Sequence, residues 1–144
     1  MRFRTGLAAA AVAMAVATIA YAQGNVIEER QAIMKANGAA IGLLPQMARG
    51  EAPFDEAAAK QALEGIATRM GTFPTLFPAG SDTGDTKAGP AIWTDMAGFE
   101  ATAASIVTAA TAAAAASTSL EALQASVGTV GAVCGECHQK YRNN

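Results

Sequence analysis

The two cysteines and the single histidine of this 144-residue chain lie within one five-residue run, Cys134-Gly135-Glu136-Cys137-His138, near the C-terminus. On a helix, positions i and i+3 share one side, so both sulfurs can form thioethers to the vinyl groups of one haem while the adjacent imidazole approaches the iron. The spacing Cys-x-x-Cys-His is the attachment pattern for haem c. It predicts one covalently bound haem per chain, with His138 as the proximal ligand. A group of that size must fill much of the core of a small domain.

Two other interpretations of the cysteine pair are weaker. A structural disulfide is poorly placed, because cysteines three apart on a helix do not reach unstrained disulfide geometry and the following histidine would be unexplained. A thioredoxin-like redox pair belongs at a helix N-terminus after a strand, whereas this pair lies near the end of the last expected helix. A four-ligand zinc site of cysteine and histidine lacks parts within one chain.

The N-terminus has the three regions of a secretory signal. Arg2 and Arg4 precede an apolar run over 7–20, and Ala20-Tyr21-Ala22 has the small-x-small form that signal peptidase accepts. The run of about 14 residues is shorter than the roughly 20 needed to cross a bilayer, and no later segment looks continuously apolar enough. We therefore expect cleavage after Ala22, export to the periplasm and no membrane contact of the mature chain 23–144. Bacterial c-type haem attachment takes place outside the cytoplasm, which agrees with export.

Composition favours one domain and limits the partners. The chain is 51% hydrophobic and 15% charged, which fits one compact domain. Loss of residues 1–22 removes two positive charges and no negative ones, so the formal charge goes from −2 to −4. Nucleic acid is not an expected partner of so acidic a chain.

Apolar residues recur at helical spacing in four stretches, and strand signals are almost absent. The expected helices span about 26–49, 55–72, 90–116 and 119–141. We expect Pro45 to kink or end the first helix, Asp55 to cap the second, and Thr118 with Glu121 to form a capping box for the fourth. Residues 72–89 read as a long loop, held inward by Phe73, Leu76 and Phe77. Four helices so joined predict an all-α antiparallel four-helix bundle with the haem in its core.

A sixth iron ligand would have to come from upstream. Met34 is the methionine of the first helix that has an arginine, Arg30, one turn earlier on the same face. Met34 can bind the iron, or it can pack over it as an ordinary core side chain. Arg30 is either a solvated surface charge or, at a boundary position, a charge-assisted partner for a haem propionate.

With this motif at the C-terminal end, the sequence resembles the class II cytochromes c, the family of cytochrome c-prime and its low-spin, methionine-ligated relatives. The resemblance covers essentially residues 23–144 and rests on several further motifs: Arg30-Gln31 with Met34-Lys35, the segment 50–55, Leu76-Phe77-Pro78-Ala79-Gly80, Ala91-Ile92-Trp93, and Tyr141-Arg142. The family implies a periplasmic left-handed four-helix bundle with haem c in its core, often as a homodimer packed through the first two helices.

Carried over to this chain, the resemblance implies that Cys134 and Cys137 hold the haem and that His138 is the proximal ligand. Arg30 and Gln31 would lie near the propionates.

The resemblance also implies that Asp85 contacts the haem edge and that Met34 takes the distal position. In cytochrome c-prime the distal residue does not bind the iron, whereas in the low-spin relatives a methionine does. Met34-Lys35 followed by Asn37-Gly38 resembles the second group. We therefore expect an electron carrier with Met34 as sixth ligand. The alternative is a five-coordinate protein that binds or scavenges nitric oxide and other diatomic gases.

An enzyme is not expected, because the chain has no second histidine and no acid–base group is evident near Met34.

Overall fold

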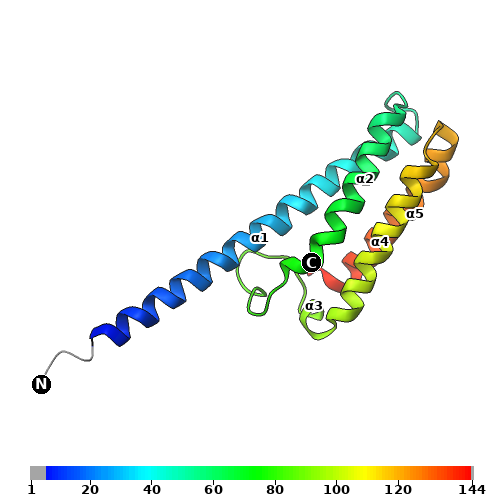
Figure 1. The fold of residues 1–144 in the computed structure, drawn as a ribbon. Helices are drawn as coiled ribbons and strands as arrows, with labels where there is room; N and C mark the ends of the chain where they lie inside the picture. The colour runs from blue at the N-terminus through cyan, green and yellow to red at the C-terminus, as the bar shows by residue number, and fades with distance from the viewer. Residues whose placement is uncertain (1–5, 144) are drawn as a thin grey trace, which may run out of the picture.

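The computed structural model describes residues 6–143, and it describes side chains from Val26 onward. In chain order the elements are α1 (Gly6–Ala48), α2 (Glu56–Thr72), the 3-10 helix η1 (Phe73–Leu76), α3 (Ala91–Thr94), α4 (Met96–Ala116) and α5 (Leu120–Tyr141). The long helices α1, α2, α4 and α5 alternate in direction and pack side by side (Figure 1). Within 6–143 the β-type pairing is one isolated bridge, between Ala88 and Arg142. The expected all-α four-helix bundle is confirmed.

Helix α1 is longer than the expected 26–49. It begins at Gly6, and its first part extends beyond the bundle (Figure 1). Pro45 lies inside the helix, which continues to Ala48, so Pro45 does not end it at once. The chain turns at Gly50, whose φ of 74° lies in the left-handed region that glycine enters without a steric cost. Arg2 and Arg4 of the predicted signal lie outside the described residues, and cleavage after Ala22 stays a prediction.

Helix α2 begins where the sequence predicts. The side chain of Asp55 accepts a 3.0 Å hydrogen bond from the backbone N–H of Ala58, which satisfies one of the free donors of the first turn. Helix α2 ends in η1, and the buried rings of Phe73 and Phe77 pack edge to face with centroids 5.1 Å apart. These two rings hold the following loop, 77–90, inward as expected, while Leu76 is half-buried.

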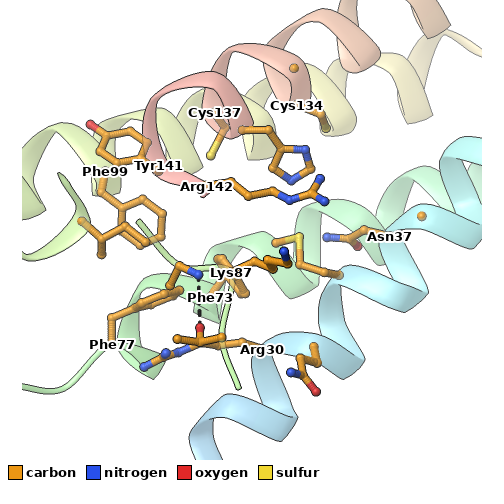
Figure 2. Close-up of a pocket in the computed structure, with 18 of the residues that line it drawn as sticks. Arg30, Asn37, Phe73, Phe77, Lys87, Phe99, Cys134, Cys137, Tyr141 and Arg142 are labelled. Atoms are coloured by element: carbon orange, nitrogen blue, oxygen red, sulfur yellow. Dashed lines mark hydrogen bonds between the residues drawn. The ribbon is translucent and has the colours of Figure 1, made fainter. Parts of the chain in front are cut away.

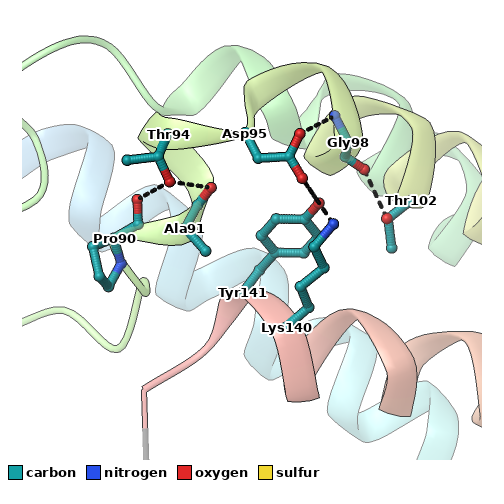
Figure 3. Close-up of polar contacts among 8 residues, drawn as sticks. All are labelled: Pro90, Ala91, Thr94, Asp95, Gly98, Thr102, Lys140 and Tyr141. Atoms are coloured by element: carbon teal, nitrogen blue, oxygen red, sulfur yellow. Dashed lines mark hydrogen bonds and ion pairs between the residues drawn. The ribbon is translucent and has the colours of Figure 1, made fainter.

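The expectation of one continuous helix over 90–116 is wrong, because the structure has two helices there, α3 and α4. The segment is divided at Asp95, whose φ of −138° and ψ of 55° are not helical. The carboxylate of Asp95 accepts a 3.2 Å hydrogen bond from the N–H of Gly98 and so caps α4 (Figure 3). The same carboxylate bonds to Lys140 and Tyr141 on α5, which ties the start of α4 to the end of α5. Because the Asp95 carboxylate bonds both to the first turn of α4 and to α5, a helix break at Asp95 is favoured over one continuous helix.

The cap of α5 also differs from the expectation. Its N-cap residue is Ser119, whose hydroxyl accepts a 3.2 Å hydrogen bond from the N–H of Ala122. The expected capping box of Thr118 and Glu121 is therefore wrong by one residue. Ser119 takes the extended backbone that an N-cap needs, and its side chain reaches the third helical N–H.

Helix α4 corrects the expectation that no later segment is apolar enough to span a membrane. Among the described residues, α4 is long and apolar enough to do so by length and composition. Its buried side chains, which include Phe99 and Ile106, belong to the core of the bundle. A core helix meets the same criteria, so this finding is weak evidence for a membrane span.

Candidate functional site

A cavity of about 660 Å³ lies between α1 and α5 (Figure 2). Loop residues Thr86, Lys87 and Ala88 form part of its wall, and the rings of Phe77 and Phe99 line it. The volume falls in the range typical of cofactor pockets. The lining is mostly apolar with a few polar groups, as is usual for a site that holds a large organic group.

Both cysteines line the cavity from α5. Cys137 is buried and Cys134 half-buried, and no disulfide joins them. Burial raises the pKa of Cys134, and burial together with the neighbouring Cys134 raises the pKa of Cys137 to about 11. Thiols with raised pKa values are poor thiolate nucleophiles, which argues against the thioredoxin-like interpretation.

His138 follows Cys137 on the same helix and also lines the cavity. His138 as a residue is exposed, but desolvation of its imidazole on the cavity side, and then the positive charge of Arg142, lower the pKa of His138. The imidazole is therefore neutral at neutral pH, which is the form that binds a metal. The residues that the attachment motif brings together in sequence thus face one cavity.

Helix α1 supplies the opposite wall. Arg30, Met34 and Asn37 all line the cavity at helical spacing, with the half-buried Met34 in the middle. Because positions three or four apart share a helix face, this wall presents a thioether flanked by a cation and an amide. The structure places Met34 on the cavity wall formed by α1, while the cysteines line the cavity from α5; its distal role stays a prediction.

Arg30 is only 4% exposed and anchors the loop that follows η1. Its Nε donates a 2.7 Å hydrogen bond to the carbonyl of Leu76, and one terminal nitrogen donates a 2.9 Å bond to the carbonyl of Ser81. The other terminal nitrogen donates to the Ser81 hydroxyl. The guanidinium also lies 4.1 Å from the centroid of the Phe77 ring, a cation–π contact. Burial lowers the pKa of Arg30, which nevertheless stays charged.

Gln31 lies at the edge of the cavity, and Asp85 lies beside it. The side-chain amide of Gln31 donates a 2.7 Å hydrogen bond to the backbone carbonyl of Asp85, which fastens the loop to α1 at a second point. Gln31 lines the cavity, whereas Asp85 is exposed and is not part of the lining.

Sequence reasoning missed a polar pair beside Met34. Arg69 of α2 donates a 2.7 Å hydrogen bond from Nε to the side-chain oxygen of Asn37, which is 9% exposed. Asn37 interrupts an apolar stripe of the first helix, and a polar residue on such a stripe is a signal for a buried hydrogen-bond partner. The partner itself, 32 positions away, leaves no trace in the local pattern.

A family model described as Cytochrome C′ matches residues 25–142, almost all of the chain after the expected signal. The chain belongs to the class II cytochrome c family. A cytochrome c-556 from Agrobacterium fabrum is 41% identical over 143 residues, which cover 99% of this chain and 97% of that protein. The solved structure of cytochrome c′ from Rhodopseudomonas palustris has a TM-score of 0.79 and 41% identity, and covers 83% of this chain and 96% of its own. A nitric oxide complex of a mutant cytochrome c prime from Alcaligenes xylosoxidans has a TM-score of 0.73 and 30% identity, with 85% and 97% covered.

Class II cytochromes c bind haem c, and the cavity fits that group. Cys134 and Cys137 are the two cysteines of the chain, and both face the cavity one helical turn apart. A neutral imidazole lies next to them, and aromatic rings line the remaining wall. The donor set and the shape thus agree with covalent attachment of one haem per chain.

Proposed function

We propose that this protein is a periplasmic electron carrier whose haem iron is bound by His138 on one side and Met34 on the other. Cys134 and Cys137 hold the haem through thioethers. The observation that carries the proposal is the position of Met34, which lines the cavity from α1 while Cys134, Cys137 and His138 line it from α5. A thioether on one face of a haem and an imidazole on the other are the ligand pair that raises the reduction potential.

The haem would supply the electron exchange, and the residues of the chain would bind it, shield it from water and keep the cavity closed. The lowered pKa of His138 favours the neutral imidazole near pH 7, which is the form that would bind the iron. The Phe77 and Phe99 rings exclude water from one part of the cavity, and Arg30 holds the loop closed over its edge. Met34 and His138 would hold the haem from two packed helices, α1 and α5, so the chain itself would move little during electron transfer.

Export is part of the proposal. Cleavage after Ala22 would leave a mature chain that begins at Gln23 and has 122 residues. Intact mass measurement of the periplasmic protein tests this: the expected mass is that of residues 23–144 plus one haem. A mass that includes residues 1–22 would contradict it.

The second candidate is a gas-binding protein in which Met34 covers the iron without binding it. It is favoured by the nitric oxide complex of the relative from Alcaligenes xylosoxidans. In that case small diatomic molecules would enter the distal side past Met34.

Replacement of Met34 by leucine distinguishes the two candidates, because leucine keeps most of the volume and removes the sulfur. Met47→Leu is a matched control, since Met47 is buried on the same helix but does not line the cavity. For an electron carrier, wild type and Met47→Leu bind carbon monoxide poorly in the ferrous state, whereas Met34→Leu binds it readily. If the wild-type protein already binds carbon monoxide as readily as Met34→Leu, Met34 does not ligate the iron.

A further inference from the structure

Arg69 is a half-buried cation outside the cavity lining, and it contacts Asn37, which is part of that lining. Arg69 lies on α2, and its guanidinium folds back over Gly65, where a Cβ would come within 2.9 Å of a terminal nitrogen. No ion pair joins Arg69 to a carboxylate among the residues with described side chains. Its Nε instead donates a 2.7 Å hydrogen bond to the side-chain oxygen of Asn37.

Asn37, the hydrogen-bond partner of Arg69, is itself part of the cavity wall. Its oxygen faces Arg69, and its amide nitrogen donates a 3.3 Å hydrogen bond to the sulfur of the buried Met70. The side chain is thus fixed at both ends, and the positive end of the amide dipole is directed away from Arg69. Asn37 lies three residues after Met34 on the same face of α1.

A fixed positive charge near a redox centre stabilises its reduced form, because reduction lowers the positive charge of the iron. The effect is stronger where the surroundings are apolar, since the effective dielectric constant is lower there. Net charge and hydrogen bonding around a cofactor are recognised determinants of its potential. The same charge on an exposed side chain would be screened by salt beyond about 10 Å at 0.1 M ionic strength.

We propose that Arg69, held by Asn37, is a positioning residue that raises the reduction potential of the haem. The inference rests on the haem site proposed above, but it does not require Met34 to bind the iron. The charge acts on the iron whether the distal position is closed or open.

Redox titration of the purified holoprotein at low and high salt tests this inference. Arg69→Gln removes the charge, and Lys60→Gln is the matched control on α2, since Lys60 is exposed and lies at 4.0 Å from Glu64. We expect Arg69→Gln to lower the midpoint potential by an amount that persists at high salt. We expect Lys60→Gln to change it little, and not at all at high salt. Equal potentials for wild type and Arg69→Gln would overturn the inference.

Two further variants separate charge from folding. Arg69→Lys keeps the charge and should keep most of the potential, even though it lacks the planar guanidinium. Asn37→Asp has nearly the shape of asparagine and would pair a carboxylate with Arg69, so it should lower the potential as Arg69→Gln does. The positive charge does not set the midpoint potential if Arg69→Lys lowers that potential as much as Arg69→Gln does while Asn37→Asp leaves it unchanged. The carbon monoxide assay of Met34→Leu does not depend on Arg69. It therefore tests the proposed function separately from the effect of Arg69 on the potential.

Discussion

The hydroxyl of Tyr141, in the last turn of α5, donates a 3.1 Å hydrogen bond to the carboxylate of Asp95, the N-cap residue of α4 (Figure 3). The ammonium of Lys140 reaches the same carboxylate at 2.7 Å. Tyr141 is buried, lines the cavity, and lies only three residues after His138. One carboxylate therefore joins the start of α4 to the helical turn that follows the proposed proximal ligand.

Asp95→Ala should lower the thermal unfolding midpoint, because it removes the helix cap together with the bonds to Lys140 and Tyr141. Asp95→Asn should lower it less, since asparagine can also cap a helix and accept a hydrogen bond. Thermal unfolding of the holoprotein followed by circular dichroism measures both. Equal midpoints for Asp95→Ala and the wild type would show that this cluster contributes nothing to stability.

The contribution of the Asp95 carboxylate should depend on pH. Its pKa is lowered from the ordinary value by Lys140 first, then by Tyr141 and the Gly98 N–H. A carboxyl group with a lowered pKa in the folded state stabilises the fold above its unfolded pKa, about 3.9 for aspartate, and this contribution is lost as the pH falls through the folded pKa. The stability difference between wild type and Asp95→Asn should thus be constant near pH 7 and shrink below about pH 4. Urea unfolding at pH 7, 4 and 3 measures it, and a difference that grows toward acid would contradict the assignment.

Removal of Arg30 should loosen the loop 77–90. Arg30→Met leaves the carbonyls of the half-buried Leu76 and the buried Ser81 without their donor, which costs about 1–3 kcal/mol. Gln31→Ala is the neighbouring control: its bond to Asp85 is exposed, and its loss should change stability by no more than about 0.5 kcal/mol. Urea unfolding gives the free energies, and limited proteolysis shows whether cleavage moves into the loop. If both variants are equally stable, Arg30 does not anchor the loop.

A core substitution away from the cavity should change stability without changing the haem. Leu63 on α2 is fully buried and does not line the cavity. Leu63→Ala should therefore cost about 2–5 kcal/mol, from lost burial and the cavity it creates. The absorption spectrum should stay that of the wild type. A shifted spectrum would mean that the haem site extends further into the bundle than the cavity does.

The cysteines should be required for covalent attachment. A Cys134→Ser/Cys137→Ser double variant should lose its haem under denaturing conditions, and each single variant should keep one thioether. Haem staining of a denaturing gel is the measurement. Haem that stays with the double variant under denaturing conditions would show that neither cysteine is the attachment point.

The bundle and the attachment motif could be predicted because they are local patterns. Apolar residues at helical spacing indicate the helices, and the spacing of Cys134 and Cys137 indicates one helix face. Asp95 was missed as a helix boundary: its cap on the N–H of Gly98 is local, but its bonds to Lys140 and Tyr141, about 45 positions later, leave no local signal.

The arrangement around Met34 was harder to foresee, because its partners come from other elements. The sequence indicates that Arg30 lies on the cavity side of the first helix. Its three hydrogen bonds to the loop depend on how residues 76–81 return to α1. The contact between Asn37 and Arg69 likewise depends on the packing of α1 against α2, which no local spacing specifies.

The absorption spectrum of the purified exported protein, oxidised and reduced, with and without carbon monoxide, tests the central claim most directly. We predict a low-spin spectrum with the weak far-red sulfur-to-iron band in the oxidised protein, and no shift of the reduced spectrum with carbon monoxide. A high-spin spectrum that shifts with carbon monoxide would contradict ligation by Met34 and favour the gas-binding alternative, and the absence of any haem signal would contradict the account as a whole.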